Sequence, residues 1–342
     1  MSAALLAGDV GGTKTTLGLF PLRGDARTPK VETTFPSAKF PDLESVVREF
    51  LAQNRAAVRY ASFGVAGPVI EGSARITNLP WVIEEKSLAA SLHISGAHLM
   101  NDLEAIASGV PLLARTDLAT LNRGRSEPEG PLAIIAPGTG LGEAFITREG
   151  PLRRVHPSEG GHADFAPTDE SQVELLKYLL KRSDQVSYED VCSGIGIRNI
   201  HAYFEKTSPT EGNSSHAKEL EVQDPVPIIA AAALSKSRRC KTCSRTMDTF
   251  VSILGAEAGN LALKVLATAG VYVAGGIPRK ILPLLKSGSF MESFVKKGLM
   301  SRLVSAIPVH VVLRPGVGLL GAANSGFESM RHDPELSREL GR

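Results

Sequence analysis

Two glycine-rich turns are the clearest places in this sequence where backbone groups could hold a phosphate. One is GDVGGT at residues 8–13 and the other is PGTGLG at residues 137–142, and each lies between two short apolar runs. Because glycine has no side chain, the backbone N–H groups of such a turn can approach an anion closely. Neither turn has the spacing of a P-loop or of a dinucleotide-binding fingerprint. Each could also be an ordinary tight hairpin, although the first carries a carboxylate at Asp9.

Side chains with acid–base or hydrogen-bonding chemistry gather at three other places. Asp102, with Asn101 before it, follows an apolar run and precedes a helical pattern, so it could be a general base or simply a helix N-cap. Glu159 and His162 flank a Gly-Gly bend, where they could bind a polyhydroxylated ligand or be structural. Glu189 taken alone is equally well an acid on the surface of a helix.

The elements that must position these groups begin with an α/β domain of about the first 110 residues. Its apolar patterns predict strands at residues 5–10, 15–20, 60–66 and 97–100, and helices at 43–53 and 84–92. Residues 111–131 are predicted to form a helix and a polar turn that lead into a second domain.

The second half of the chain is predicted to be mostly helical. A strand at residues 132–135 is followed by helices at 171–181, 187–191, 195–206, 226–234 and 242–268, with a surface loop at 208–224. A buried strand at 271–274 then ends at Gly275-Gly276 before a helix at 280–286. Proteins of the α/β class bind nucleotides at such a point, although a tight βα turn is the alternative.

Composition limits the class of partner. The chain has 342 residues, 43% of them hydrophobic, which suits two globular domains. Its 38 basic and 36 acidic side chains nearly balance, so no broad basic surface for nucleic acid is expected and small molecules are the favoured partners. The sequence shows neither an apolar run long enough to span a membrane nor a signal peptide, and a cytoplasmic protein is therefore expected.

The three cysteines do not suggest a disulfide framework, because their number is odd and the chain is long. Cys240 and Cys243 have the spacing of half a zinc site or of a redox pair, but no second pair completes a metal site. The sequence therefore favours structural or incidental thiols, with Cys192 as the third.

Eight short motifs together resemble the bacterial ATP-dependent glucokinases, which belong to the actin/hexokinase/Hsp70-like kinase superfamily. In chain order they are GDVGGT, GVAGPV (64–69), TNLPW (77–81), NDLEA (101–105), APGTGLG, SEGGHADFAP (158–167), YEDVCSG (188–194) and VAGGI (273–277). The resemblance extends from residue 8 to about residue 321. Lys14 after GGT is also typical of a wider repressor/kinase sugar family, but the cysteine-rich zinc motif of that family does not follow His162, so the resemblance favours the glucokinases and no zinc is expected.

The resemblance implies a two-lobed α/β fold of the actin-like, ribonuclease H-like type, with the active site in the cleft between two domains. Residues 1–112 and 321–342 would form a small α/β domain, and residues 113–320 a large α/β domain with helical insertions. The implied reaction transfers the γ-phosphate of MgATP to the 6-hydroxyl of glucose, giving glucose 6-phosphate and ADP, in a homodimer. A kinase acting on another hexose and a slow sugar-sensing regulator are the alternatives.

The resemblance also implies a role for each candidate residue. Asp102 would accept the proton of the sugar 6-hydroxyl as that oxygen attacks the γ-phosphate. The other hydroxyl groups would be held by Asn78, Asn101, Glu159, His162 and Glu189. Asp9 would orient Mg²⁺ through water. The nucleotide would contact Gly11, Gly12, Thr13, Lys14, Gly138, Thr139 and Gly140, and its adenosine would lie against Gly275 and Gly276.

Overall fold

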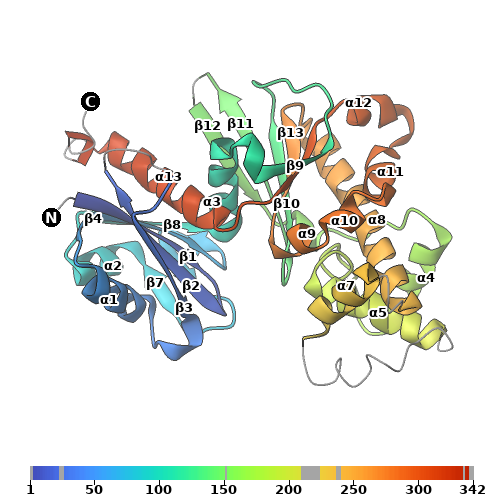
Figure 1. Cartoon of the computed structure of the whole chain (residues 1–342), viewed down its shortest axis with the longest axis horizontal. Helices are drawn as coiled ribbons and strands as arrows, with labels where there is room; N and C mark the ends of the chain where they lie inside the picture. The colour runs from blue at the N-terminus through green and yellow to red at the C-terminus, as the bar shows by residue number, and fades with distance from the viewer. Residues whose placement is uncertain are drawn as a thin grey trace. The chain divides into compact units, whose positions relative to one another are not determined.

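The computed structural model describes residues 3–22, 27–150, 152–208, 224–235, 240–333 and 336–338. The chain forms two compact units, one of Met1–Ala114 with Arg314–Arg342 and the other of Arg115–Leu313 (Figure 1). The expected boundary at 320/321 would divide helix α13 (Val317–His332), whereas the chain returns to the first unit before this helix begins. Most of the loop expected at residues 208–224 lies outside the described residues.

The first unit is built on a five-stranded sheet in the order β3-β2-β1-β4-β8. Its strands are β1 (Ala3–Val10), β2 (Lys14–Pro21), β3 (Val31–Pro36), β4 (Ala57–Val65) and β8 (Gly96–Asn101). β1 pairs antiparallel with β2 and parallel with β4, and β4 pairs parallel with β8. The four strands predicted for this region are therefore confirmed. A small antiparallel sheet adds β5 (Val69–Ile70), β6 (Ser73–Arg75) and β7 (Val82–Glu84).

Helices cover both faces of this sheet. They are α1 (Leu43–Asn54), α2 (Glu85–Leu92), α3 (Asp102–Gly109) and α13, with short 3₁₀ turns at Ser37–Lys39, Val110–Leu112 and Leu336–Arg338. Successive side chains of β1 point to opposite faces, so Leu6 packs in the core with α1 and α2 while Leu5 and Ala7 pack with residues of α13. A strand that is apolar on both faces is typical of a sheet covered on both sides.

The second unit contains a six-stranded sheet in the order β12-β11-β10-β13-β14-β9. Its strands are β9 (Leu118–Asn122), β10 (Leu132–Pro137), β11 (Leu141–Glu149), β12 (Leu152–Ser158), β13 (Gly270–Val273) and β14 (Val309–Val312). The prediction of a helix and polar turn at residues 111–131 is wrong at β9, which follows a 3₁₀ turn (Arg115–Asp117). β9 pairs antiparallel with β14, far away in the sequence, so no local pattern marks it as a strand.

The helices of the second unit gather around the long helix α8 (Lys241–Val265; Figure 1). Phe250, Leu254 and Ala258 of α8 are fully buried. The others are α4 (Glu170–Leu179), α5 (Gly194–Thr207), α7 (Pro225–Leu234), α9 (Gly276–Lys280), α10 (Leu282–Leu285), α11 (Ser289–Val295) and α12 (Ser301–Ser305), with 3₁₀ turns at Gly160–His162 and Gly298–Met300. The helices predicted at 171–181, 195–206, 226–234 and 242–268 are confirmed. The helix predicted at 280–286 is instead two short helices, α9 and α10, that meet at Ile281.

The helix predicted at residues 187–191 is wrong. Ser187 donates from both its backbone N and its Oγ to Asp190 Oδ2, at 2.8 and 2.7 Å, which closes a turn. The backbone N–H groups of Tyr188 and Glu189 donate outward, to the carbonyls of Ala163 and Gly161. The bonds between Ser187 and Asp190 and these contacts with residues 161 and 163 hold the segment as a turn, so the tertiary structure overrides the local pattern.

The preference for free thiols at Cys240 and Cys243 is also wrong, because the two form a disulfide. Cys240 is the N-cap of α8 and its Sγ accepts from the backbone N of Cys243. A separation of three residues across the first turn of a helix brings the Cα atoms within 5.2 Å, a spacing that a disulfide can bridge. Cys192 is buried and unbonded.

None of the described helices is both long and apolar enough to cross a membrane.

Candidate active site

The first glycine turn connects β1 to β2 and is closed by a hydrogen bond from Gly11 N to the Lys14 carbonyl, 3.0 Å long. Gly12 has no room for a side chain, since a Cβ atom would lie 2.7 Å from the carbonyl oxygen of Thr77 and 3.5 Å from Asn78 Cβ. Asn78 has φ +64°, a left-handed conformation in which asparagine is enriched among residues with side chains. The structure therefore brings Asn78 next to the turn that the sequence predicts to bind phosphate.

Asp9 lies beside the N-terminal turn of α13. A Cβ atom on Gly318 would be 3.2 Å from Asp9 Oδ2, so the absence of a side chain at this position leaves the carboxylate its room beside the helix. Burial raises the pKa of Asp9, and the charge of Lys14 partly offsets this shift. The N-terminus of a helix of this length carries partial positive charge, which favours an anion at this position. The sequence analysis missed Gly318, although the glycines that precede the LLGAA run could have indicated a close helix start.

Asn101 and Asp102 lie at the junction of β8 and α3. Asn101 is the N-cap, because its Oδ1 accepts from Leu103 N at 2.9 Å while Glu104 Oε2 accepts from Asn101 N at 2.9 Å. The alternative in which Asp102 caps the helix is therefore wrong, and Asp102 is its first residue. Asn101 Nδ2 also donates to the Gly67 carbonyl. These bonds fix the backbone that carries the Asp102 carboxyl.

Replacing Glu104 with alanine is expected to destabilise the protein by about 1 kcal/mol, because the backbone N–H of Asn101 then loses its acceptor in the capping box. Chemical denaturation followed by circular dichroism measures the difference. Glu104→Gln keeps an acceptor at the same place and serves as the control. Equal stability of Glu104→Ala and the wild type would show that the capping box is dispensable.

The second glycine turn connects β10 to β11, and Gly138 N donates to the Gly140 carbonyl at 2.8 Å. Two glycine-bearing segments pack against it. Gly194 N, at the start of α5, donates to the Gly138 carbonyl at 2.8 Å, and Gly275, at φ +92°, has no room for a Cβ atom because the Pro137 carbonyl oxygen would be 2.6 Å away. The turn, a helix N-terminus and Gly275 thus form one cluster of the kind that binds phosphate groups. Sequence reasoning missed Gly194, although Ser193-Gly194 before a helical pattern is a recognisable cap.

Glu159 and His162 border the short 3₁₀ turn that follows β12. Their side chains are 82% and 63% exposed, and His162 Nε2 lies 4.0 Å from Glu159 Oε2. Gly161 packs directly against the Leu141 carbonyl, and its own carbonyl accepts from Glu189 N at 2.8 Å. The turn at residues 159–162 is therefore held beside both the second glycine turn and Glu189, with its polar side chains available to a ligand.

Glu189 contacts both the second glycine turn and the turn at residues 159–162. Its Oε2 accepts from Leu141 N at 2.8 Å, and its carboxylate also fills the space where a side chain on Gly140 would lie. The alternative in which Glu189 is an acid on the surface of a helix is wrong, because Glu189 is half-buried and lies in a turn.

The predicted residues thus form one group in each unit. In the first unit, Asp9, Gly11, Gly12, Thr13 and Lys14 lie at the turn from β1 to β2, Asn101 and Asp102 lie at the end of β8, and Asn78, between β6 and β7, lies beside Gly12. In the second unit, Gly138, Thr139, Gly140, Glu159, His162, Gly275 and Gly276 lie at the ends of β10, β12 and β13, and Glu189, between α4 and α5, bonds to Leu141 beside them. Parallel strands present their carboxyl ends at one edge of a sheet, which is where ligands of α/β proteins bind.

The family model for glucokinase matches residues 6–327. The chain belongs to the glucokinase family. It is 42% identical over 334 residues to the glucokinase of Nostoc punctiforme, with 93% of this chain and 97% of that one covered. The glucokinase of Synechocystis is 40% identical over 352 residues, with 96% and 99% covered. The expected family is therefore confirmed.

A solved glucokinase from an Antarctic psychrotroph superposes on the chain with a TM-score of 0.81 at 28% identity, covering 95% of this chain and 99% of that one. This likeness, together with the two α/β units, confirms the expected actin-like α/β fold class.

Proposed function

We propose that the protein is a glucokinase that transfers the γ-phosphoryl group of MgATP to the 6-hydroxyl of glucose. The observation that carries the proposal is the gathering of the predicted polar and glycine residues at the strand ends of each unit, in a chain that matches the glucokinase family over residues 6–327. Phosphoryl transfer needs little covalent chemistry from the protein, so positioning and charge stabilisation account for most of the catalysis.

Asp102 is the proposed general base. It lies at the first position of α3, where the capping box of Asn101 and Glu104 holds the backbone. Its carboxyl group would accept the proton of the 6-hydroxyl as that oxygen attacks the γ-phosphorus in line with the leaving ADP oxygen. Asn78, Asn101, Glu159, His162 and Glu189 would bind the remaining hydroxyl groups, since carboxylates accept hydrogen bonds and amides and imidazole can donate them.

The nucleotide phosphates would be bound by backbone N–H groups of the two glycine turns, with Lys14 supplying positive charge beside the first. Gly275 and Gly276 would lie against the adenosine. Among the described residues, no cluster of three or more histidine, cysteine or acidic side chains could hold a metal ion by itself. Mg²⁺ usually takes one or two carboxylates and completes its shell with water and substrate phosphates. Asp9 is the carboxylate proposed to orient it, and the bound ion would neutralise charge on the phosphates.

A steady-state assay with MgATP and a panel of sugars tests the proposed function. Glucose is expected to have a kcat/KM at least about tenfold above those of mannose, fructose, glucosamine and N-acetylglucosamine, because each analogue changes the geometry, charge or size of the groups at C1 or C2. Preference for another sugar in the panel would reassign the acceptor. Turnover of none of them, with glucose still bound, would favour a sugar-sensing regulator.

A homodimer in the cytoplasm is part of the same proposal and follows from the family pattern. Sedimentation velocity at micromolar concentration is expected to give twice the 36.3 kDa mass of the chain. A concentration-independent monomer would contradict this part of the proposal alone.

A further inference from the structure

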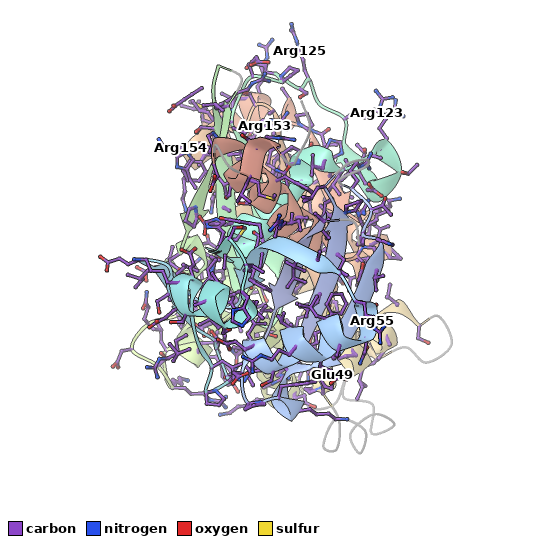
Figure 2. The ribbon with its side chains drawn as sticks, turned by 90° about the vertical axis from the view of Figure 1, so that its left-hand side faces the viewer. Glu49, Arg55, Arg123, Arg125, Arg153 and Arg154 are labelled. Carbon is purple, nitrogen blue, oxygen red and sulfur yellow. A yellow bond between two sulfur atoms is a disulfide. The ribbon has the colours of Figure 1, made fainter. Side chains whose placement is uncertain are left out.

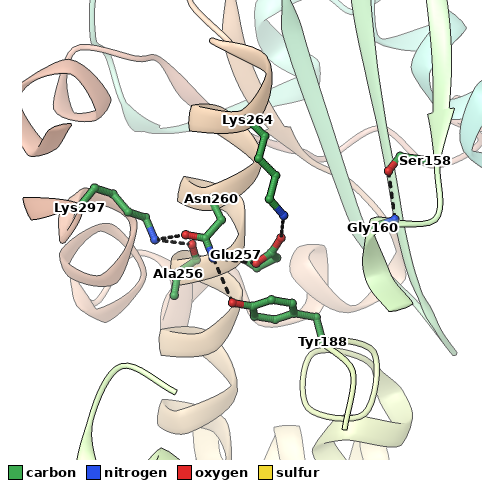
Figure 3. Close-up of polar contacts among 8 residues, drawn as sticks. All are labelled: Ser158, Gly160, Tyr188, Ala256, Glu257, Asn260, Lys264 and Lys297. Carbon is green, nitrogen blue, oxygen red and sulfur yellow. Dashed lines mark hydrogen bonds and ion pairs between the residues drawn. The ribbon is translucent and has the colours of Figure 1, made fainter. Parts of the chain in front are cut away.

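Two carboxyl groups are buried together in the second unit, close to the turn at residues 159–162. Glu143 on β11 is 1% exposed and Glu257 on α8 is fully buried. Glu257 is well bonded, since Asn260 Nδ2 donates to its Oε2 at 2.9 Å and Lys264 Nζ lies 3.4 Å from its Oε1 (Figure 3). Glu143 Oε1, by contrast, has no hydrogen-bond partner among the described residues. A buried carboxylate oxygen without a partner is costly when the group is charged, so this geometry favours the neutral form of Glu143.

Glu143 supports the turn directly. It is paired across the strands with Ser158, whose Oγ accepts from Gly160 N at 3.0 Å (Figure 3). The Glu143 carboxyl occupies the place that a side chain on Gly160 would need, so it packs against the backbone of the turn itself. Movement of this carboxyl group would be transmitted to residues 159–162 without any intervening side chain.

The network around Glu257 reaches the other sugar-side segment. Asn260 Nδ2 donates to the Tyr188 hydroxyl at 3.0 Å, and Lys297 Nζ donates to Asn260 Oδ1 and to the Ala256 carbonyl, both at 2.7 Å (Figure 3). Tyr188 immediately precedes Glu189. The buried pair therefore lies between the segments that carry Glu159 and His162 on one side and Glu189 on the other.

We propose that Glu143 is a positioning residue of the sugar site, whose neutral carboxyl group supports the turn at residues 159–162 and whose ionisation weakens sugar binding. This inference rests on the proposed function, because that function assigns the turn to the sugar. Glu143 is absent from the residues that the family pattern suggests, and it touches the ligand only through the turn.

The electrostatic surroundings agree with the geometry. Burial raises the pKa of Glu143 to about 8, the charge of Glu257 adds to the shift, and Lys264 partly opposes it. The other titratable groups of the cluster are also affected: burial raises the pKa of the Cys192 thiol and of the Tyr188 hydroxyl and lowers that of Lys297. The Glu143 proton is therefore present at neutral pH and is lost within the range of an ordinary binding experiment.

Calorimetric titration of the full chain with glucose, without nucleotide, tests the inference. The Kd of the wild type is expected to rise about tenfold from pH 7 to pH 9, because a group with a pKa of about 8 keeps about one tenth of its protons at pH 9. Glu143→Gln keeps a neutral group of the same shape, so its Kd is expected to stay flat. Glu149→Gln, on the exposed end of the same strand, is the control and should follow the wild type. In turnover assays, the same change between pH 7 and pH 9 should appear in KM more than in kcat.

A second variant keeps the inference testable if Glu143→Gln folds poorly. Glu257→Gln removes the negative neighbour and leaves Lys264, so Glu143 should ionise more easily and the rise in Kd should move to lower pH. The inference would be overturned if the Kd for glucose still rose over the same pH range in both variants. It would also be overturned if the wild-type Kd were equal at pH 7 and pH 9. Failure of the wild type to bind glucose at pH 7 would instead contradict the proposed function.

Discussion

Replacing Asp102 with asparagine is expected to lower kcat by about 10²–10⁴-fold while leaving the Kd for glucose nearly unchanged. The amide has the size and shape of the carboxyl group but cannot accept the proton of the 6-hydroxyl. The backbone should stay in place, because the N-cap of α3 is Asn101 and its capping box with Glu104 does not involve the Asp102 side chain.

Separate measurements of turnover and of glucose binding are needed for this variant. Glu104→Gln, on the same helix turn, is the control for a general disturbance of α3, and its kcat should stay close to that of the wild type. An Asp102→Asn enzyme with a wild-type kcat would eliminate Asp102 as the base. A loss of glucose affinity equal to the loss of turnover would make Asp102 a binding residue only.

Replacing Gly321 with alanine is expected to destabilise the first unit by about 2–4 kcal/mol. Gly321 on α13 packs against the carbonyl of Ala105 on α3, and Gly109 on α3 packs against the carbonyl of Val317 on α13. A methyl group at Gly321 would overlap the Ala105 oxygen, and backbone cannot move aside as the end of a flexible side chain can. At a solvent-exposed position in a helix, the same substitution would instead stabilise the protein by about 1 kcal/mol, so the packing here decides the sign of the effect.

Denaturant titration of the purified variant measures this change. Glu328→Ala, on the exposed face of α13, is the matched control and should change the free energy of unfolding by no more than about 0.5 kcal/mol. Because α3 carries Asp102 at its start, a shift of the two helices should also lower kcat. A Gly321→Ala protein as stable as the wild type would mean that α3 and α13 can separate without loss.

The sequence predicts most of the fold because its strongest signals are local. The two glycine turns lie between strands as expected, and the long apolar patterns of α5 and α8 are helices. The failures occur where distant segments decide the structure. Residues 118–122 form a strand because β14 provides a partner, and residues 187–191 form a turn that is closed by the bonds between Ser187 and Asp190 and held by contacts with residues 161 and 163.

The candidate site was predicted less completely than the fold. The polar residues proposed to bind the ligands could be named from the motifs, since their types and order carry the resemblance. The supporting residues were harder to find. The glycines before the LLGAA run and the Ser193-Gly194 pair are local signals for Gly318 and Gly194, but the place of Glu143 beneath Gly160 is a packing constraint with no signature in the sequence around it. The N-cap of α3 is Asn101 and not Asp102, because one residue of uncertainty in a predicted helix boundary is enough to exchange the two.

The position of Glu189 has a thermodynamic consequence. Its backbone N–H bonds to the carbonyl of Gly161 in the turn proposed to bind the sugar, and its carboxylate bonds to Leu141 N at the end of the turn proposed to bind phosphate. If each ligand stabilises the same arrangement of this one residue, the two binding equilibria are linked, and the factor by which glucose raises the affinity for nucleotide equals the factor by which nucleotide raises the affinity for glucose. The complex with both ligands would then be populated at the expense of either complex with one, whichever ligand arrives first.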